Sequence, residues 1–366
     1  MAGNKSLNAA YKAKEDEFYT ELSDIENELK HYKQHFKDKV VLCNCDDPRI
    51  SNFFHYFSYN FEQLGLKKLI TTCYKSQERD LFSQNNSERA IWLEYTGDRN
   101  GNRVPDPEEI GINYLKGDGD FRSEECINLL KQADIVVTNP PFSLFREYVA
   151  QLMKYEKKFV IIGNQNNISY KEIFAYIKAN QLWLGSSLSF AKFRVPDYYE
   201  PRATRFWIDE TGQKWRSMGN ICWFTNLDIA KRHEELILYK SYNSEDYPHY
   251  DNYDAINVNK VAEIPMDYDG VMGVPITFLD KYNPEQFEIL GITQRNDDPY
   301  KIKKYTTEEY KNANDLNARA VLIINGIPKT MYARILIRRK QPASQYQTPD
   351  DQLRMAAEPN ASYNKK

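Results

Sequence analysis

The sequence ADIVVTNPPFSLFREYV, residues 133–149, decides how the centre of this chain folds. A short apolar run, residues 135–137, stops at the motif NPPF, residues 139–142, and helix-compatible sequence follows. Two consecutive prolines cannot continue a central strand, because each lacks an N–H group and has a fixed φ angle. The stretch therefore predicts a buried strand that ends in a stiff, non-helical turn and is followed by a helix.

Apolar runs that alternate with helical patterns extend on both sides of this stretch. Seven of these runs are predicted strands: residues 39–45, 67–75, 110–115, 135–138, 157–163, 181–186 and 219–227. Helical patterns occupy residues 24–36, 52–65, 123–133, 145–155 and 169–180. Residues 76–109, which contain the strand-like AIWLEY, are expected to form an insertion. This order predicts an α/β fold, a seven-stranded and mostly parallel sheet with helices on both faces.

Composition narrows the class of protein. The 366 residues are 41% hydrophobic and 28% charged, which is typical of a soluble globular protein. No run of about 18 apolar residues and no apolar signal-peptide core is visible, so we expect a cytoplasmic protein without a membrane partner. The net charge of −3 requires any nucleic-acid surface to be local. The five cysteines lack zinc spacing and are expected to be buried thiols, with no bound metal.

Three polar loops are predicted at the carboxyl ends of strands, where sheets of this class bind ligands. They are DDP (residues 46–48), GDGDF (residues 117–121) and NPPF. In the NPPF turn, the side-chain oxygen of Asn139 and the carbonyl oxygen of Pro140 can lie side by side as two acceptors. Such a pair matches the two N–H donors of an exocyclic amino group, and the ring of Phe142 can stack on a planar base. The alternative is a Pro-Pro helix start without chemistry.

DIVVTNPPF resembles motif IV of the amino-group methyltransferases that use S-adenosylmethionine. EDEFYT (15–20), CNCDDPRISNFF (43–54), GDGDF and YDGVMGVPITFLDKYNPEQFEILG (268–291) resemble the EcoRI-type adenine-specific DNA methyltransferase family over residues 16–340. The resemblance implies a Rossmann-like methyltransferase fold, the cofactor S-adenosyl-L-methionine, the product S-adenosyl-L-homocysteine and no metal. It also implies N6 methylation of an adenine flipped out of double-stranded DNA, in a bacterial or phage restriction–modification or solitary system. We expect a monomer.

The resemblance assigns roles to individual residues. The catalytic set, which holds the target amino group and base, is Asn139, Pro140, Pro141 and Phe142. The cofactor-binding set is Phe18, Tyr19, Thr20, Asn44, Asp46, Asp47, Pro48, Asp118, Asp120, Phe121, Asn139 and Pro140. Asp120 is expected to accept a hydrogen bond from the cofactor's adenine amino group, with Asp118 as the competing candidate. Alternatively, Asp46 and Asp47 cap the following helix, and the acids of GDGD are solvated turn residues.

A change of pattern after Asp228 predicts the domain organisation. We expect a mobile N-terminus (1–14), a catalytic domain (15–228), a target-recognition region (229–341) and a flexible polar tail (342–366). In the third part, Asn325-Gly326 between two apolar runs predicts a hairpin.

The end of the target-recognition region is locally basic. Residues 300–340 hold ten basic and three acidic residues, a local charge of +7 in a chain of net −3. Because Lys and Arg neutralise phosphates, we expect Arg334, Arg338 and Arg339 to include DNA phosphate contacts. The alternative is a solvated basic face that balances acids elsewhere in the chain.

Two other functions fit the same residues. NPPF turns also occur in RNA adenine and protein-glutamine methyltransferases, which would use the same site. A catalytically silent nucleic-acid-binding protein with a methyltransferase fold is the alternative from a different class. The intact Asn139 and Phe142 argue against this last interpretation.

Overall fold

The computed structural model describes residues 19–44, 51–73, 90–102, 105–106, 109–187, 192–195, 199, 201, 203–294 and 299–340. The chain divides into two compact units, Met1–Ile229 and Ala230–Lys366, called the first and the second unit below. The predicted mobile N-terminus and polar tail lie outside the described residues. So do four residues predicted to bind the cofactor, Phe18, Asp46, Asp47 and Pro48.

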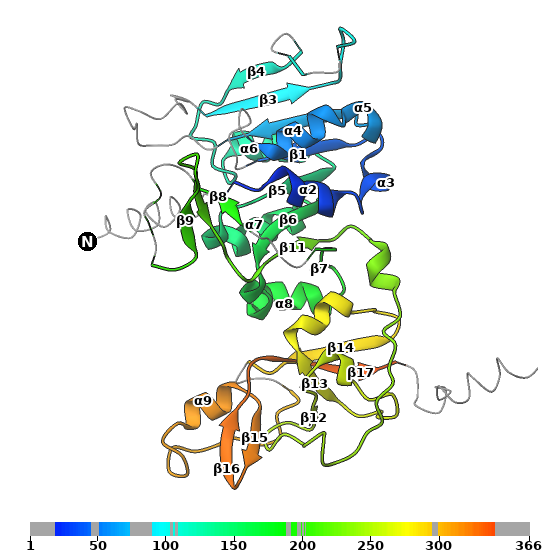
Figure 1. Cartoon of the computed structure of the whole chain (residues 1–366), viewed down its shortest axis with the longest axis vertical. Helices are drawn as coiled ribbons and strands as arrows, with labels where there is room; N and C mark the ends of the chain where they lie inside the picture. The colour runs from blue at the N-terminus through cyan, green and yellow to red at the C-terminus, as the bar shows by residue number, and fades with distance from the viewer. Residues whose placement is uncertain are drawn as a thin grey trace, which may run out of the picture. The chain divides into compact units, whose positions relative to one another are not determined.

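The first unit is built on a large mixed sheet with the strand order β4-β3-β2-β1-β5-β6-β11-β7 (Figure 1). Its strands are β1 (Val40–Cys43), β2 (Lys68–Thr72), β3 (Ile91–Tyr95), β4 (Gly111–Tyr114), β5 (Ile135–Thr138), β6 (Lys158–Asn164), β7 (Trp183–Leu184) and β11 (Ile221–Thr225). The four central strands, β2, β1, β5 and β6, run parallel. β1 and β5 are buried along their whole length, as their continuous apolar sequences predict.

The predicted fold class, α/β, is confirmed, but the prediction of seven mostly parallel strands is wrong. AIWLEY, which was expected in an insertion, forms β3 and joins the main sheet beside β2, so the sheet has eight strands. Outside the parallel centre, the described pairings β2–β3, β3–β4, β6–β11 and β11–β7 are antiparallel. β3 alternates buried and half-buried residues, which is the pattern of an antiparallel strand, and β4 is exposed at the sheet edge.

β4 nevertheless runs parallel to the central strands, because the antiparallel pairings β2–β3 and β3–β4 reverse the strand direction twice. The carboxyl ends of β1, β2, β4, β5 and β6 therefore lie at one edge of the sheet. At this edge Gly119, whose φ is +83°, packs against the end of β2. A Cβ atom on Gly119 would lie 2.2 Å from the carbonyl oxygen of Cys73, so only glycine allows the GDGDF loop this close approach.

Helices cover both faces of the main sheet (Figure 1). The helical elements of this unit are α2 (Leu22–Leu29), α3 (Lys33–Phe36), α4 (Asn52–Tyr59), α5 (Phe61–Leu64), α6 (Glu124–Gln132), η1 (Phe142–Leu144), α7 (Phe145–Lys154), η2 (Gln165–Ser169) and α8 (Lys171–Lys178). In β11, the ring centroid of Trp223 lies 6.3 Å from that of Phe53 in α4, and Phe224 lies 5.0 Å from Phe145 in α7. Because successive strand residues point to opposite faces, α4 and α7 lie on opposite sides of the sheet.

The first unit also contains a three-stranded sheet that the sequence did not predict. Its strands are β8 (Phe193–Arg194), β9 (Phe206–Ile208) and β10 (Lys214–Arg216), in the antiparallel order β8-β10-β9. Tyr19 extends this sheet through an antiparallel bridge to Arg194. Strands of two or three residues are too short to show a hydrophobic period, which explains why the sequence gave no sign of them.

The second unit contains a four-stranded sheet, in the order β12-β13-β17-β14, and a two-stranded hairpin. Its elements are η3 (Ala230–His233), β12 (Ile256–Asn257), η4 (Val261–Glu263), β13 (Met272–Pro275), η5 (Ile276–Lys281), β14 (Phe287–Ile292), α9 (Ala313–Ala318), β15 (Val321–Ile324), β16 (Ile327–Thr330) and β17 (Arg334–Arg339). The hairpin of β15 and β16 turns at Asn325 and Gly326, with φ angles of +53° and +74°. This confirms the hairpin predicted from the Asn-Gly pair, since both turn positions need positive φ.

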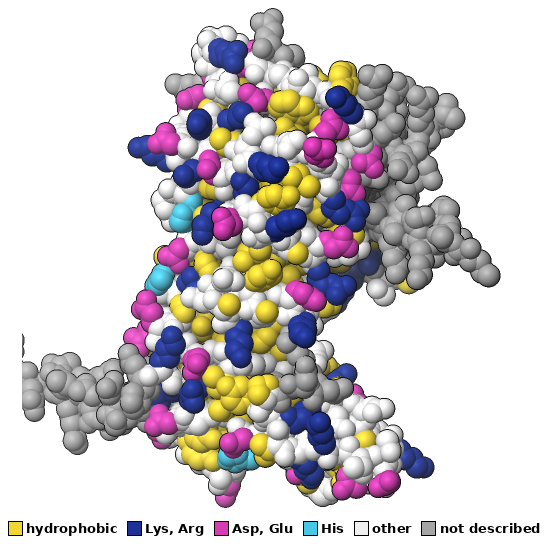
Figure 2. Space-filling view, turned by 180° about the vertical axis from the view of Figure 1, so that it is seen from behind, with side chains coloured by type: hydrophobic (Ala, Val, Ile, Leu, Met, Phe, Trp, Pro, Cys, Tyr) yellow, Lys and Arg dark blue, Asp and Glu magenta, His cyan; other side chains and the backbone are white. Residues whose placement is uncertain are grey.

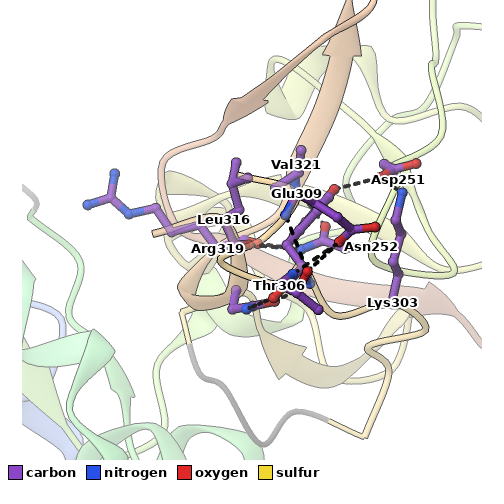
Figure 3. Close-up of polar contacts among 10 residues, drawn as sticks. Asp251, Asn252, Lys303, Thr306, Glu309, Leu316, Arg319 and Val321 are labelled. Atoms are coloured by element: carbon purple, nitrogen blue, oxygen red, sulfur yellow. Dashed lines mark hydrogen bonds and ion pairs between the residues drawn. The ribbon is translucent and has the colours of Figure 1, made fainter. Parts of the chain in front are cut away.

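A buried asparagine joins the hairpin to the rest of the second unit (Figure 3). Asn252 has no exposed surface. Its Nδ2 donates to the carbonyl oxygens of Leu316, at 3.2 Å, and Arg319, at 2.7 Å, and its Oδ1 accepts from Val321 N at 2.8 Å. The neighbouring Asp251 forms an ion pair with Lys303, with 2.7 Å between Oδ2 and Nζ. These contacts fix the start of β15 and the end of α9.

Replacing Asn252 with alanine should destabilise this network by about 1–3 kcal/mol, because a buried N–H and two carbonyls lose their partner. Thermal and denaturant unfolding of the full chain would measure the change. Asn314→Ala is the matched control, because Asn314 lies exposed on α9 and should leave stability within about 0.5 kcal/mol. Equal stability of the two variants would contradict the role given to Asn252.

The predictions about cysteines, metal sites and membrane helices can be compared with the structure only for the described residues. The cysteines within the described residues, Cys43, Cys73, Cys126 and Cys222, are buried and unbridged, as predicted, and Cys45 lies outside them. Among the residues that the structure describes, no group of His, Cys, Asp and Glu is arranged to hold a metal. No helix in the described ranges is long and apolar enough to cross a membrane.

Candidate active site

Asn139 stands at the point where β5 ends. The residue is 7% exposed, and its Nδ2 donates to the hydroxyl oxygen of Thr20 at 3.4 Å. Thr20 is itself 2% exposed, and its carbonyl oxygen accepts from Nδ2 of Asn52 in α4 at 2.7 Å. Thr20 therefore orients the Asn139 amide, with the amide Nδ2 directed at the Thr20 hydroxyl.

The NPPF turn has the conformation that its two prolines predict. Pro140 is buried, and Pro141 is half-buried and extended, with φ −55° and ψ 125°. The chain then forms η1, in which Leu144 N donates to the Pro141 carbonyl at 3.0 Å, and continues into α7. Phe142 is half-buried and packs against the hydrophobic core. The predicted order of strand, stiff turn and helix is confirmed.

Asn44, at the end of β1, joins three elements at the same edge of the sheet. Its carbonyl oxygen accepts from the hydroxyl of Thr138, the last residue of β5. Its side-chain Oδ1 accepts from the hydroxyl of Tyr148 in α7. The sequence singled out Asn44 but not Tyr148, because a tyrosine on the buried face of an amphipathic helix carries no motif.

The GDGDF loop packs onto the same helix. The ring of Phe121 is 7% exposed and meets the ring of Tyr148 edge to face, with centroids 5.0 Å apart. Nε2 of Gln151, one turn further along α7, donates to the carbonyl oxygen of Phe121 at 2.9 Å. The loops after β1, β4 and β5 therefore share α7 as a common support, which brings the described members of the predicted site together.

The two acids of GDGDF have different surroundings. Asp120 forms an ion pair with Arg122, with 2.6 Å between Oδ2 and Nη2 and 2.9 Å between Oδ1 and Nε. Arg122 also pairs with Glu147 of α7 at 3.0 Å. Asp118, in contrast, accepts from the backbone N of Asp120 at 3.0 Å and closes the turn. Asp120 makes the same kind of turn contact, because its Oδ1 accepts from the backbone N of Arg122 at 2.8 Å, so the ion pair with Arg122 is what distinguishes Asp120 from Asp118.

The protonation state of Asp120 follows from its partners. Partial burial acts to raise the pKa of the carboxyl group, but the hydrogen bonds and positive charge of Arg122 outweigh burial and lower the pKa below its usual value. Asp120 is therefore an ionised acceptor at neutral pH, and its four lone-pair positions exceed those that Arg122 occupies.

The helix-cap alternative for Asp46 and Asp47 is wrong. α4 begins at Asn52, and its N-cap residue is Ser51, which has extended backbone angles. Asp46, Asp47 and Pro48 themselves lie outside the described residues.

Three buried polar atoms at this edge lack a partner in the described part of the chain: Ser51 Oγ, Thr71 Oγ1 and Asn167 Nδ2. Ser51 follows the loop after β1, Thr71 lies near the end of β2, and Asn167 belongs to η2 directly after β6. Buried polar groups are nearly always hydrogen-bonded, so these atoms fit the polar groups of a bound cofactor or substrate. No motif marks them, and sequence reasoning missed all three.

A pocket of about 410 Å³ lies at the opposite edge of the sheet. It is lined by Lys39, Asp134 and Lys158, which precede or begin β1, β5 and β6. The amino ends of parallel strands are the wrong edge for ligands of such sheets. The loops at the carboxyl ends of β1, β4 and β5, and not this pocket, therefore define the candidate active site.

The three arginines predicted to contact DNA differ in accessibility. Arg334 is 9% exposed, with its Nε 3.4 Å from Asn257 Oδ1, and Arg339 is 6% exposed and donates from Nη1 to the Met266 carbonyl oxygen. Arg338 is exposed and pairs with Glu288 at 2.9 Å. Of the three, Arg338 presents its guanidinium to solvent, while the other two hold the second unit together.

Other exposed cations of the basic segment were counted in the sequence but not singled out. They are Lys304, Lys311, Lys329 and Lys340, none of which pairs with an acidic side chain within the described ranges. An unpaired surface lysine can neutralise a phosphate without first breaking an ion pair. These lysines therefore add to Arg338 as accessible positive charge.

A mixed α/β sheet that presents an Asn-Pro-Pro-Phe turn, supported by the loops after β1 and β4, is consistent with the methyltransferase class of enzymes. The chain matches the model of the family described as adenine-specific methyltransferase EcoRI over residues 6–340, and it belongs to that family. It is accordingly an enzyme, a methyltransferase.

Relatives cover nearly the whole chain. The Type II methyltransferase M.EcoRI of Escherichia coli is 51% identical over 344 residues, which are 93% of this chain and 98% of the relative. The Type II methyltransferase M.MgeORF184P of Mycoplasma genitalium is 41% identical over 92% of this chain and 99% of its own length. The Type II methyltransferase M.MpnI of Mycoplasma pneumoniae is 38% identical over 92% of this chain and 98% of its own length. No solved structure matches the chain.

Proposed function

We propose that this protein is a site-specific DNA adenine N6-methyltransferase. It transfers the methyl group of S-adenosyl-L-methionine to the amino group of an adenine flipped out of double-stranded DNA. The setting is a restriction–modification or solitary modification system, as the names of the Type II relatives suggest. The observation that carries the proposal is Asn139, nearly buried at the end of β5 and oriented by Thr20.

Asn139 and Pro140 hold the target amino group. Oδ1 of Asn139 and the carbonyl oxygen of Pro140 accept its two N–H donors, which draws the nitrogen lone pair out of conjugation with the ring. Phe142, half-buried at the start of η1, gives the flipped base a stacking surface. The chain thus orients the nucleophile, which is the main contribution that such a reaction requires.

The cofactor supplies a sulfonium-bound methyl group when it is bound. A bond forms between the amino nitrogen and the methyl carbon while the carbon–sulfur bond breaks, and the electron pair stays on sulfur. The nitrogen then loses one proton to solvent, which leaves N6-methyladenine and S-adenosyl-L-homocysteine. Asp120, Phe121 and the polar atoms of Ser51 and Thr71 are the residues proposed to hold the cofactor.

A methyl-transfer assay with tritiated S-adenosylmethionine tests the proposed function directly. Unmethylated double-stranded DNA, RNA and protein are offered separately to the purified chain, and the labelled product is digested to identify the modified base or residue. Label in N6-methyladenine of DNA is the expected result. Label in RNA or in protein glutamine would establish an alternative substrate, and label in none of the three would contradict the proposed function.

Thr20 is expected to position Asn139. Thr20→Val keeps the shape of the side chain but removes the acceptor for Asn139 Nδ2. Turnover should therefore fall about tenfold, because the net contribution of one hydrogen bond corresponds to roughly that factor. Thr20→Ser restores the hydroxyl and should recover most of the activity. Equal turnover of the valine and serine variants, measured at saturating cofactor, would contradict this role.

DNA binding is proposed to involve the basic segment of the second unit. On the face seen in Figure 2, Lys and Arg side chains alternate with Asp and Glu and form no continuous basic surface. The whole chain has a net charge of −3, whereas residues 300–340 carry a local charge of +7 that can attract DNA. Within this segment, Arg338 and the four unpaired lysines are exposed.

Arg338→Ala should weaken DNA binding several-fold at all sequences alike and reduce the slope of log K against log salt by about one, as for loss of one phosphate contact. Its exposed pair with Glu288 is worth little, so Arg338 can exchange that partner for a phosphate. Glu288→Gln removes the negative charge that pairs with Arg338 and should therefore tighten DNA binding. Fluorescence anisotropy over a range of salt concentrations measures both variants, and an unchanged slope in Arg338→Ala would exclude the contact.

A further inference from the structure

Arg216, the last residue of β10, is half-buried, and two nitrogen atoms of its guanidinium group are fully buried. These atoms are Nε and Nη1, and neither has a hydrogen-bond acceptor in the part of the chain that the structure describes. The guanidinium lies over the ring of Tyr199, with 5.8 Å between Cζ and the ring centroid. An aromatic ring stabilises a cation but accepts no in-plane N–H bond, so the donors of this fork remain unsatisfied.

The register of the small sheet places Arg216 on the same face as Thr20. Tyr19 pairs with Arg194, and Phe193 pairs with Arg216, both in antiparallel ladders. Continuing the first ladder by one residue puts Thr20 opposite Phe193. Thr20, Phe193 and Arg216 thus form one row across three adjacent strands, and side chains in such a row project to the same face.

This face is the one that meets the catalytic turn. The hydroxyl of Thr20 contacts the amide of Asn139, so the row begins at the residue proposed to hold the target amino group. Adjacent strands lie about 4.8 Å apart, which places the Arg216 backbone about 10 Å from that of Thr20. An arginine side chain can span most of that distance and reach a group bound beside Asn139.

Leaving this guanidinium unpaired is costly. Arginine stays protonated in proteins, so it cannot relieve the cost of burial by losing a proton. Charged donor atoms that are buried without an acceptor destabilise a protein unless a counter-charge satisfies them. The planar fork of N–H donors matches the two oxygens of a carboxylate or phosphate. The free enzyme therefore contains a preformed half of an anion site.

We propose that Arg216 binds an anionic oxygen group of one of the two substrates beside Asn139. This proposal rests on the proposed function. Two groups have the required chemistry: a phosphate of the DNA strand that carries the target adenine, and the carboxylate of the methionine part of the cofactor. In either case Arg216 is a binding residue, supplied by a sheet that also holds Tyr19 and thereby Thr20.

Arg216→Gln and Arg216→Lys test the proposal in two separate binding experiments. Calorimetry with S-adenosylhomocysteine measures the cofactor arm, and fluorescence anisotropy with a duplex that the wild-type chain methylates measures the DNA arm. Arg216→Gln should weaken either the affinity for S-adenosylhomocysteine or the affinity for the DNA duplex at least tenfold. Arg216→Lys, which keeps the charge but not the fork, should recover part of the loss. A loss confined to calorimetry assigns the carboxylate, and a loss confined to anisotropy assigns the phosphate.

Arg146→Gln is the matched control. Arg146 also lies over a tyrosine ring, 4.7 Å from the centroid of Tyr170, but it is exposed on α7. This variant should change neither affinity. The thermal midpoint of Arg216→Gln should equal or exceed that of the wild type, because the change removes a charged group whose two buried nitrogens have no acceptor among the described residues.

Two results would overturn the inference. One is unchanged affinity in both arms for Arg216→Gln. The other is a clear fall in its thermal midpoint, because the guanidinium would then serve the fold of the free protein. If the wild type methylates no DNA, the proposed function fails, whereas calorimetry with S-adenosylhomocysteine still tests Arg216 by itself.

Discussion

Asn139→Ala should lower methyl transfer by on the order of a hundredfold or more, which is the effect of losing one positioned polar group at a reacting atom. The variant keeps the turn, because Pro140, Pro141 and their packing are untouched. It loses the acceptor for the target amino group, so the nitrogen is neither oriented nor activated. Single-turnover transfer to DNA at saturating cofactor isolates this step from binding.

Two further measurements make the Asn139 result specific. Affinity for S-adenosylhomocysteine should change far less than turnover, since the proposed acceptor faces the substrate. Asn128→Ala, at an exposed position of α6, is the matched control and should retain full activity. Turnover of Asn139→Ala within a few-fold of the wild type would remove Asn139 from the catalytic set.

Asp120→Ala should weaken S-adenosylmethionine binding by about ten- to hundredfold, because a hydrogen bond from the cofactor's amino group to a carboxylate contributes roughly 1.5–3 kcal/mol. Its lowered pKa keeps this carboxylate ionised, so binding should not weaken until the pH falls through the folded-state pKa, below the usual range for aspartate. Asp118→Ala should have the smaller effect, since Asp120 is the acid proposed to accept from the cofactor. Calorimetry ranks the two variants, and the opposite order would reverse the assignment.

The ion pair with Arg122 requires its own control. If Asp120 acts only by holding Arg122, then Arg122→Gln should weaken cofactor binding as much as Asp120→Ala does. If Asp120 contacts the cofactor, Arg122→Gln leaves the acceptor in place and should cost much less. The comparison separates a direct contact from a structural one, because both variants break the same 2.6 Å pair.

The GDGDF loop shows where prediction from sequence was sufficient and where it was not. Gly119 and the acids around it predicted a tight turn after a strand, and the turn is present. The sequence could not rank Asp118 against Asp120, because the difference between them comes from Arg122 and from Glu147, a residue of α7. A partner 25 residues away along the chain is brought near only by the packing of a helix against the sheet.

The sequence by itself determined the elements whose signals are local. A continuous apolar run gave β5, the two prolines gave the turn at Asn139, and the Asn325-Gly326 pair gave the hairpin, since each depends on neighbouring backbone angles and periodicity. Tertiary structure alone decided that β3 joins the sheet antiparallel and that Arg339 is buried while Arg338 is exposed. It also decided that Thr20, 119 residues before Asn139, contacts the Asn139 amide. Strand direction, burial and such contacts depend on residues distant in the chain, whose meeting is fixed by packing energy and not by any local pattern.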